Sequence, residues 1–453
     1  MANVHMGNGE IEWHGVKFPK YTSGIEFVRP GVAVYRPAGL INSIDIGKRT
    51  DERGVRYWAA LEPIMVGLCP TDQAGGNGSF PPESTRPFGL ENEPAVGGHE
   101  GVYILKAAHP RGLKILARQG IIPGDYVTGN INIGDGTCLA CRRGAPALDC
   151  YNGPTFVGIG TMVEAEKWVK RETGRTQLPG AYVGSGGAVF VPISHVHKIP
   201  ANMAETDRGL ALGTQIDAVA CAYSLWDAVG LETYVQGFRG VHELNILAIG
   251  SGRVALWGLD VLKERLGQLG ARGNIFLCDT REGNLERVGD ACGVPDENRY
   301  LVGRSRNPFS MRNLRSGFNY PSLGGDFRFD IAVDFAGPGA LDQKRICELF
   351  DDVIAPQGIV ATMAHGGYPG HELKMASGER LLKGHRLVIG LSPRNNMGRG
   401  ADFLSRHANK FKPMMREIPG GLDERLAEQV ASGGAAVKNE MEATVFYTRI
   451  SSN

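Results

Sequence analysis

The sequence predicts an α/β protein with two domains: a β-rich first domain and a second domain built on a doubly wound parallel sheet. Its length of 453 residues exceeds what a single hydrophobic core usually supports, so two cores are expected. From about Gly24 to His197, short apolar runs are separated by glycine, proline and aspartate, which favours strands and turns. After Pro200, apolar runs alternate with helix-length segments, which is typical of a parallel sheet covered on both faces.

Composition narrows the classes of partner. The formal net charge is +1 and the charged residues are scattered, so nothing in the sequence would attract nucleic acid or an anionic membrane. No apolar run approaches the roughly 20 residues that span a bilayer, and residues 1–13 lack an export pattern. Eight cysteines are too few for a disulfide scaffold in so long a chain. We therefore expect a cytoplasmic protein with small-molecule partners, no nucleic acid and no membrane.

The expected strands of the first domain are the apolar runs at residues 32–35, 58–66, 101–105, 126–131 and 188–191. A long alanine-rich stretch, residues 205–229, contains few helix-breaking residues and favours a helix that leads into the second domain.

In the second domain we expect strands at residues 244–249, 275–278, 300–302, 331–335 and 358–363, and helices that include 253–269 and 340–354. Beyond Gly378 the pattern is mixed, and periodicity fits either a return to the first domain or a cap on the second. Our boundaries are an N-terminal extension at 1–24, the first domain at 25–204 with 385–453, and a dinucleotide-binding domain at 205–384.

The turn after the first strand of the second domain is a candidate nucleotide site. Gly250-Ser-Gly252-Arg253-Val254-Ala255 follows the apolar run 244–249 and opens an expected helix. Glycines at these positions let the backbone turn sharply and approach a pyrophosphate, and the helix N-terminus offers unpaired N–H groups. A small residue, Ala255, stands where the helix packs against the strand. The alternative is that this strand, turn and helix have a purely structural role and bind no ligand.

An acidic residue completes this pattern. Asp279 follows the second apolar run, where its carboxylate could accept hydrogen bonds from ribose hydroxyls and would repel a 2′-phosphate. This favours NAD over NADP as the cofactor. Arg281, two residues further on, could instead turn toward a phosphate, and it keeps NADP open as the less favoured choice.

Two segments of the β-rich half carry candidate metal ligands. The first is Gly67-Leu-Cys69-Pro-Thr71-Asp72 and the second is Gly97-Gly-His99-Glu100-Gly. Thiolate and imidazole groups are good Zn²⁺ ligands, and a catalytic zinc needs three or four protein groups. Taken alone, each segment has an ordinary explanation, because a single cysteine is usually a core residue and a histidine near glycines is usually part of a turn.

Together with the Gly250 turn, these segments resemble the zinc-containing medium-chain dehydrogenase/reductase family over nearly the whole chain from about residue 25. The resemblance implies a GroES-like catalytic domain and a Rossmann domain. It further implies that Cys69 and His99 bind a catalytic zinc with Glu100 on or beside it. Thr71 would relay the alcohol proton, and Asp72 would orient the imidazole.

The remaining ligand of this zinc varies among subfamilies. Gln215 best resembles the glutamine of glucose-dehydrogenase-like members, and Asp217 and Cys221 are rivals nearby. Relatives often continue the proton relay with a histidine three residues past the hydroxyl residue, but this chain has Ala74 there.

A second cluster consists of Asp135, Cys138, Cys141 and Cys150. A C-x-x-C knuckle followed by another cysteine is a strong indication of a structural zinc, because four donors close a tetrahedron around the ion. The family usually has four cysteines here, and Asp135 stands where the first would be. A carboxylate can serve as a zinc ligand, although oxygen is a harder donor than sulfur. The alternative is a loop without metal.

The resemblance implies a zinc-dependent oxidoreductase that transfers hydride between a hydroxyl-bearing small molecule, such as a sugar, polyol or alcohol, and NAD. Asn395 and Asn396 are candidate substrate contacts, and relatives commonly form homodimers or homotetramers. One alternative is a zinc-poor NAD(P)-dependent reductase of an aldehyde, ketone or activated alkene. Another is a non-catalytic nucleotide-binding protein on the same fold.

Overall fold

The computed structural model describes residues 9–29, 32–69, 72, 86–87, 95–237, 243–303, 310–318, 327–336, 346, 348–363, 384–389, 393, 395–431 and 445–450. The chain divides into two compact units, residues 1–217 with 397–453, and residues 218–396. Among the described helices, none combines the length and the apolar character needed to cross a membrane.

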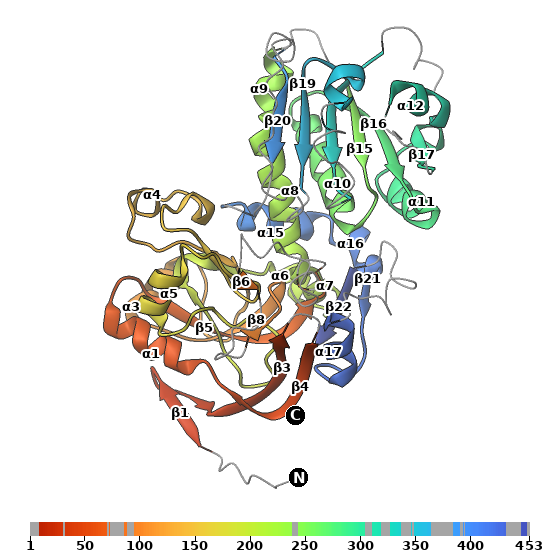
Figure 1. Ribbon diagram of the computed structural model, residues 1–453. Helices are drawn as coiled ribbons and strands as arrows, with labels where there is room; N and C mark the ends of the chain where they lie inside the picture. Colours follow the sequence, from red (N-terminus) through yellow and green to blue (C-terminus); the bar gives the residue numbers. More distant parts are fainter. Residues whose placement is uncertain are drawn as a thin grey trace. The chain divides into compact units, whose positions relative to one another are not determined.

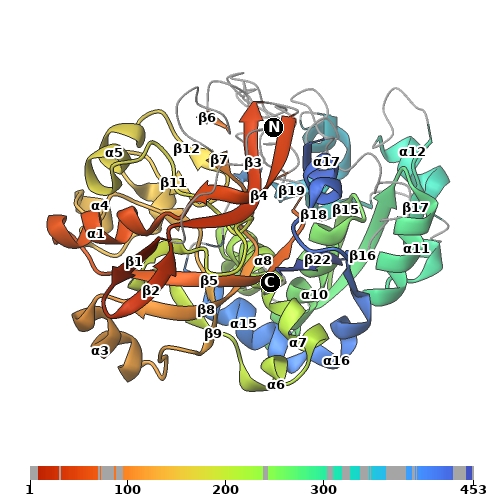
Figure 2. The same ribbon diagram turned by 90° about the horizontal axis from the view of Figure 1, so that it is seen from below.

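The first unit is rich in β-structure (Figure 2). Its strands are β1 (Glu10–Trp13), β2 (Val16–Pro19), β3 (Tyr21–Arg29), β4 (Val32–Ile41), β5 (Trp58–Gly67), β6 (Arg86–Pro87), β7 (Ala95–Val96), β8 (Gly101–Ala108), β9 (Tyr126–Gly129), β10 (Asn132–Ile133), β11 (Thr155–Phe156), β12 (Gly160–Thr161), β13 (Val189–Pro192), β14 (Val196–Lys198), β21 (Met415–Glu417) and β22 (Val445–Arg449). The principal sheet has the order β14-β9-β8-β5-β22-β21, and β13 also pairs with β5.

Short helices surround these strands. They are α1 (Ile44–Arg53), α3 (Pro110–Arg118), α4 (Leu139–Arg142), α5 (Glu166–Thr173), α6 (Ala201–Ala204), α7 (Asp207–Leu212), α15 (Met397–Arg406), α16 (Ala408–Phe411) and α17 (Glu424–Ala431), with 3₁₀ turns at Ala147–Asp149, Ile193–His195, Gly213–Gln215 and Lys412–Met414. The β-rich character expected for this part of the chain is confirmed.

Both ends of the chain contribute to the first unit. The β1–β2 hairpin lies within the segment expected as an extension, and its Trp13 and Phe18 are buried in the core of this unit. Strand β22 pairs antiparallel with β5, with Tyr447 opposite Gly67. The mixed C-terminal region therefore contains a strand of the principal sheet. Its Val445 and Tyr447 are buried, as expected for alternate residues of a strand that packs one face against the core.

The second unit is a parallel sheet with helices packed around it (Figure 1). Its strands are β15 (Glu243–Ile249), β16 (Arg272–Asp279), β17 (Arg299–Leu301), β18 (Phe329–Asp334), β19 (Ile354–Thr362) and β20 (Arg386–Ile389). Its helices are α8 (Ile216–Val229), which begins at the boundary, α9 (Leu231–Gly237), α10 (Arg253–Gln268), α11 (Glu282–Ala291) and α12 (Met311–Gly317), with a 3₁₀ turn at Asp296–Asn298 and a π-helical turn at Leu349–Val353.

The strand order is β17-β16-β15-β18-β19-β20, and all five pairings are parallel. Counted along the chain this is the order 3-2-1-4-5-6, which defines a Rossmann-type sheet. The interior strands are nearly continuous apolar runs because both faces are covered, and Leu247, Phe276 and Phe329 belong to a fully buried core cluster. The expected doubly wound domain is thereby confirmed.

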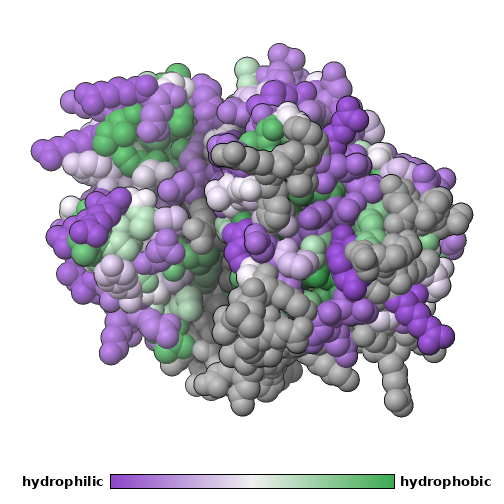
Figure 3. All heavy atoms as spheres, turned by 90° about the horizontal axis from the view of Figure 1, so that it is seen from above, coloured by the Kyte–Doolittle hydropathy of each residue, from purple (hydrophilic) through white to green (hydrophobic). Residues whose placement is uncertain are grey.

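On the face seen in Figure 3, the coloured residues are largely hydrophilic, with hydrophobic residues gathered in separate patches. The large apolar side chains of the described residues lie mainly in the interiors of the two units, where burial removes them from water.

Candidate functional sites

The pairing of β5 with β8 brings the first set of candidate ligands together. The two strands are antiparallel with Val66 opposite Gly101, so the end of β5 lies beside the start of β8. Cys69 follows the first and Glu100 precedes the second, and the backbone N of Gly67 donates to the carbonyl of Glu100 at 2.8 Å. The potential ligand atoms of Cys69, His99 and Glu100 all lie within 4.8 Å of one another, and the three residues are buried.

Asp72 contacts the imidazole of this cluster. Its Oδ1 atom lies 2.7 Å from Nδ1 of His99, and both side chains are buried. Burial alone would lower the pKa of His99, but the Asp72 carboxylate and the Cys69 sulfur outweigh it and raise that pKa well above its usual value. Because Nδ1 faces Asp72, Nε2 is the ring nitrogen left to bind a metal ion.

Gln215 reaches the same place from the 3₁₀ turn after α7. Its Nε2 atom donates to Oε2 of Glu100 at 3.5 Å and to Oγ1 of Thr214 at 3.0 Å. A Cβ atom on Gly67 would lie 2.9 Å from Oε2 of Glu100 and 3.2 Å from Nε2 of Gln215, so the absence of a side chain at Gly67 makes room for both. The rivals Asp217 and Cys221 lie on α8 and are not members of the ligand group.

The donors of this cluster fit a zinc ion. Thiolate, imidazole and carboxylate are its usual ligands, and donors at about 2.0–2.3 Å from a tetrahedral ion stand about 3–4 Å apart. The observed spread of up to 4.8 Å needs only a small closure. Thr71, the expected proton acceptor, lies outside the described residues.

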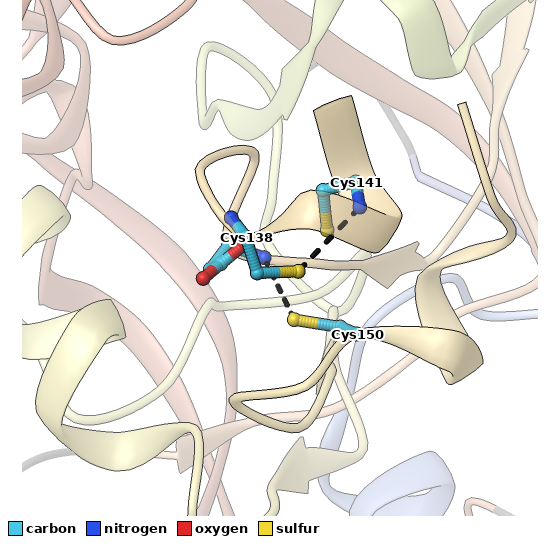
Figure 4. A group of neighbouring side chains, drawn as sticks. Cys138, Cys141 and Cys150 are labelled. Carbon is cyan, nitrogen blue, oxygen red and sulfur yellow. Dashed lines mark hydrogen bonds between the residues drawn. The ribbon is translucent and has the colours of Figure 1, made fainter. Parts of the chain in front are cut away.

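The second cluster lies in the lobe around α4. The sulfur atoms of Cys138, Cys141 and Cys150 point toward one another (Figure 4), and a carboxylate oxygen of Asp135 lies with them inside 4.8 Å. The backbone N of Cys141 donates to Sγ of Cys138 at 3.5 Å, and the backbone N of Asp135 donates to Sγ of Cys150 at 3.3 Å. Donated N–H groups of this kind stabilise thiolates, the form in which cysteine binds metal.

Asp135 also organises the loop. Its carboxylate accepts from the backbone N atoms of Thr137 and Cys138 at 2.9 and 3.0 Å, and from Nδ2 of Asn152 at 2.5 Å. Burial would raise the pKa of Asp135, but these hydrogen bonds lower it far below its ordinary value. The group is therefore a carboxylate at neutral pH, as a metal ligand must be.

The candidate nucleotide site has the expected strand–turn–helix form. Gly250 has φ of +92°, and a Cβ atom there would lie 2.6 Å from the backbone N of Ala336. Gly252 precedes α10 in an extended conformation, and a Cβ atom there would meet no atom of the described part of the chain within 4 Å. Arg253 and Val254 are the first residues of the helix. The N-cap residue Gly252 has no side chain that could bind these N–H groups, and a helix N-terminus of this kind favours an anion.

Asp279 lies at the end of β16, beside this turn. One of its oxygens accepts from the backbone N and the hydroxyl of Ser251 at 2.6 and 2.7 Å. The other accepts from the backbone N of Arg281 at 2.9 Å, and the Arg281 guanidinium forms an ion pair with it at 3.5 Å.

The asparagine pair lies at the end of the second unit. Asn395 is exposed, whereas Asn396 is buried and its amide donates to Ser224 at 2.9 Å and to Asp227 at 3.2 Å, both on α8. The Asn396 amide thus has structural partners within its own unit.

Sequence reasoning missed two residues at these sites, Ser251 and Tyr182. Tyr182 is fully buried, and its hydroxyl donates to Oδ2 of Asp72 at 3.4 Å. The middle position of a Gly-x-Gly turn could have drawn attention to Ser251. Nothing local marks Tyr182.

No protein-family model matches the chain, and no curated protein sequence matches it. Several solved structures do resemble it. An alcohol dehydrogenase from Thermus sp. ATN1 is 18% identical, with a TM-score of 0.60 over 95% of this chain and 100% of that one. An alcohol dehydrogenase from the archaeon Aeropyrum pernix is 15% identical, with a TM-score of 0.61 over 94% and 99% of the two chains.

Two further neighbours have cofactors bound. A short chain alcohol dehydrogenase from E. coli CFT073, complexed with NADH, is 15% identical, with a TM-score of 0.62 over 95% of this chain and 99% of that one. A protein from Sinorhizobium meliloti 1021 bound to NADP is 18% identical, with a TM-score of 0.60 over the same shares. At such identities the likeness establishes the fold: a GroES-like unit joined to a Rossmann unit, as in alcohol dehydrogenases.

Proposed function

We propose that this protein is a zinc-dependent oxidoreductase that transfers hydride between a hydroxyl-bearing small molecule and NAD. The observation that carries the proposal is the convergence of Cys69, His99 and Glu100 in a buried group of zinc-type donors. It is supported by a second feature of the same chain, a Rossmann turn with an acidic residue beside it. Neither feature alone would suffice, because folds of this kind host several functions.

In this proposal Cys69 and His99 hold the catalytic ion, and Asp72 fixes the imidazole so that Nε2 faces it. The Nε2 atom of Gln215 donates to Glu100, and the amide oxygen of Gln215 would complete the ligand set. Glu100 then orients that amide or binds the ion itself. A bound Zn²⁺ would supply Lewis acidity that favours loss of the substrate's hydroxyl proton, and bound NAD would accept the hydride.

The chain's own groups would move that proton. Thr71 is the proposed first acceptor, on the strength of the sequence pattern alone. Ala74 cannot continue the relay because it carries no titratable group, so the proton leaves by another route.

For the cofactor, Gly250 and Gly252 would let the backbone approach the pyrophosphate while the N–H groups of α10 bind it. The negative charge of Asp279 would oppose a 2′-phosphate, which favours NAD over NADP. The lobe of Asp135, Cys138, Cys141 and Cys150 would hold a second, structural zinc that staples the loop.

The proposed substrates are sugars, polyols or simple alcohols, because glutamine at the third ligand position is the feature of glucose-dehydrogenase-like enzymes. The two alternatives, a zinc-poor reductase and a non-catalytic nucleotide-binding protein, are outcomes of the test below.

The test combines metal analysis with a substrate panel. The purified protein should contain about two zinc ions per chain, and it should reduce NAD⁺ in the presence of at least one sugar, polyol or alcohol. Cys69→Ser should lose one zinc and nearly all turnover. Cys292→Ser changes a buried cysteine outside both clusters and should lose neither.

The other outcomes decide between the alternatives. A Cys69→Ser variant as active as the parent would remove the catalytic metal from the proposal. Protein with one zinc ion, held only by the Cys138 lobe, together with reduction of an aldehyde, ketone or alkene, would favour the reductase. NAD binding without turnover on any substrate would favour a non-catalytic nucleotide-binding protein.

A further inference from the structure

Tyr182 contacts the proposed catalytic site through Asp72. Its backbone forms hydrogen bonds on two sides. Residues 180–182 run beside residues 96–98: the backbone N atoms of Gly180 and Tyr182 donate to the carbonyls of Val96 and Gly97 at 2.8 and 2.9 Å. On the other side, the backbone N of Ile25 donates to the carbonyl of Tyr182 at 2.9 Å. The position of the tyrosine Cα is therefore fixed relative to the Gly-Gly-His segment.

The ring has little freedom to move. It is fully buried, and it lies against Gly97 and Gly98, where added Cβ atoms would stand 3.1 and 3.0 Å from its Cδ2 and Cδ1 atoms. The ring of Phe27 packs nearby, with centroids 6.5 Å apart. The two glycines, Gly98 with φ of +88°, let the tyrosine ring pass under the segment that carries His99. A ring so enclosed keeps its hydroxyl at one place.

That place is beside Asp72. The tyrosine hydroxyl donates to Oδ2 of Asp72 at 3.4 Å, while Oδ1 of the same carboxylate faces Nδ1 of His99 at 2.7 Å. A buried carboxylate with a partner on only one oxygen could rotate and carry the imidazole with it. With a partner on each oxygen, its rotation is opposed on both sides.

We propose that Tyr182 is a positioning residue of the zinc site: its hydroxyl holds the Asp72 carboxylate in the plane that orients the His99 imidazole toward the metal. This inference rests on the proposed function, since it needs a zinc ion bound by His99. Tyr182 is not one of the proposed zinc ligands, and its hydroxyl contacts Asp72, so its effect should appear in zinc affinity and pass through Asp72.

The experiment measures zinc affinity in the full chain by competition with a chromophoric chelator. Tyr182→Phe keeps the ring and removes only the hydroxyl. It should weaken zinc at the first site by about 10- to 100-fold, the range typical for groups that orient a metal-binding histidine, and leave the Cys138 lobe unchanged. The melting temperature of the metal-free variant should stay close to that of the metal-free parent.

The matched control is Tyr223→Phe. Tyr223 is also a buried tyrosine whose hydroxyl donates to a carboxylate, Oε1 of Glu264 at 2.8 Å, but it lies in the second unit. Its loss should not change zinc affinity. The same measurement on Asp72→Asn, with and without Tyr182→Phe, tests the route: once Asp72 is changed, removal of the tyrosine hydroxyl should have little further effect.

Parent-like zinc affinity in Tyr182→Phe, or an undiminished loss in the Asp72→Asn background, would overturn the assignment and leave the proposed function standing. A parent that binds no zinc at Cys69 and His99 would overturn both. If Tyr182→Phe does not fold, parent-like zinc affinity in Asp72→Asn would overturn the assignment, because the tyrosine hydroxyl can act on the ion only through Asp72.

Discussion

One carboxylate oxygen of Asp279 accepts two hydrogen bonds from a single residue, from the backbone N of Ser251 at 2.6 Å and from its hydroxyl at 2.7 Å. These bonds tie the end of β16 to the turn that follows β15, across neighbouring parallel strands. Asp279 thus has two separable functions in the proposed cofactor site: it holds the turn, and it places a negative charge beside it.

The charge predicts cofactor choice. Asp279→Gly should lower the preference for NAD over NADP by about tenfold or more, because the carboxylate that opposes a 2′-phosphate is gone. Ser251→Ala removes the hydrogen bond that the serine hydroxyl donates to Asp279 but keeps the carboxylate charge, so it should change the preference little. The measurement is kcat/KM with each cofactor. An NAD-to-NADP ratio in Asp279→Gly equal to that of the parent would exclude Asp279 from the site.

Substitution of the two glycines of the turn, Gly250 and Gly252, should have different effects: one on stability and the other on NAD binding. Gly252→Ala adds a methyl group that meets no atom of the described residues within 4 Å, so the melting temperature should not change. NAD binding should weaken by about tenfold or more, since the methyl group would stand where the pyrophosphate approaches. Gly250→Ala forces an L-residue to φ of +92° against the backbone of Ala336 and should destabilise the fold by about 2 kcal/mol or more. Calorimetry for NAD binding and thermal unfolding separate the two. Unimpaired NAD binding by Gly252→Ala would contradict the proposed pyrophosphate position.

Gly67→Ala should disturb the proposed metal site of Cys69, His99 and Glu100. Its methyl group would stand 2.9 Å from Glu100 and 3.2 Å from Gln215, so both side chains must shift. We expect zinc affinity and turnover to fall by about tenfold, with a stability loss of about 1–3 kcal/mol. Gly129→Ala is the control, since its methyl would lie 3.5 Å from Leu61 in the same sheet, at ordinary contact distance. If the two variants bind zinc alike, Gly67 does not shape the site.

The cysteine lobe should lose its metal separately. Cys141→Ser should release one zinc per chain and lower the melting temperature, because the loop has little core of its own, while the first site keeps its ion. Asp135→Asn keeps an oxygen acceptor for the loop amides but loses the charge, so a weaker second zinc in this variant would identify Asp135 as a ligand. Elemental analysis and unfolding curves measure both effects. A full zinc complement in Cys141→Ser would rule out the lobe as a metal site.

Two histidines with lowered pKa values should make the folded protein less stable in acid. Burial lowers the pKa of His197 to about 4, and burial followed by the Arg56 charge lowers that of His195 to about 3. Unfolded histidine has a pKa near 6.5, so below that pH the unfolded chain binds more protons than the folded one and stability falls. The loss reaches at most about 1.4 kcal/mol per pH unit for each histidine. The melting temperature is measured at pH 7 and pH 5 and compared with its value at pH 7.5. The drop between pH 7 and pH 5 should be smaller in His197→Gln than in the parent, and an equal drop in the two proteins would refute the assignment.

Much of the fold was predictable because its signals are local. A strand buried on both faces is a continuous apolar run, and a helix that follows a glycine turn starts within a few residues of it. Strands β15 to β19 and helix α10 of the second unit could therefore be placed from the sequence, whereas β20 was not predicted. The ligand types were predictable for the same reason. Cysteine, histidine and acidic residues stand in short segments whose spacing is visible without any contact information.

The parts that could not be predicted depend on register and packing. Gln215 meets Glu100, and Tyr182 meets Asp72, only because the strands pair in one register and the glycines at positions 67, 97 and 98 leave room. The Ser251 hydroxyl finds Asp279 because two parallel strands end side by side. The strand β22 reaches β5 across most of the chain, and periodicity beyond Gly378 could not say which unit it would join.

The sequence by itself determined which chemical groups the protein possesses and in which order strands, turns and helices follow one another, since both are properties of neighbouring residues. Only the tertiary structure decided which of those groups share one buried space. A hydrogen bond between distant residues is set by the positions of two backbones to within less than an ångström, and no local pattern carries that information.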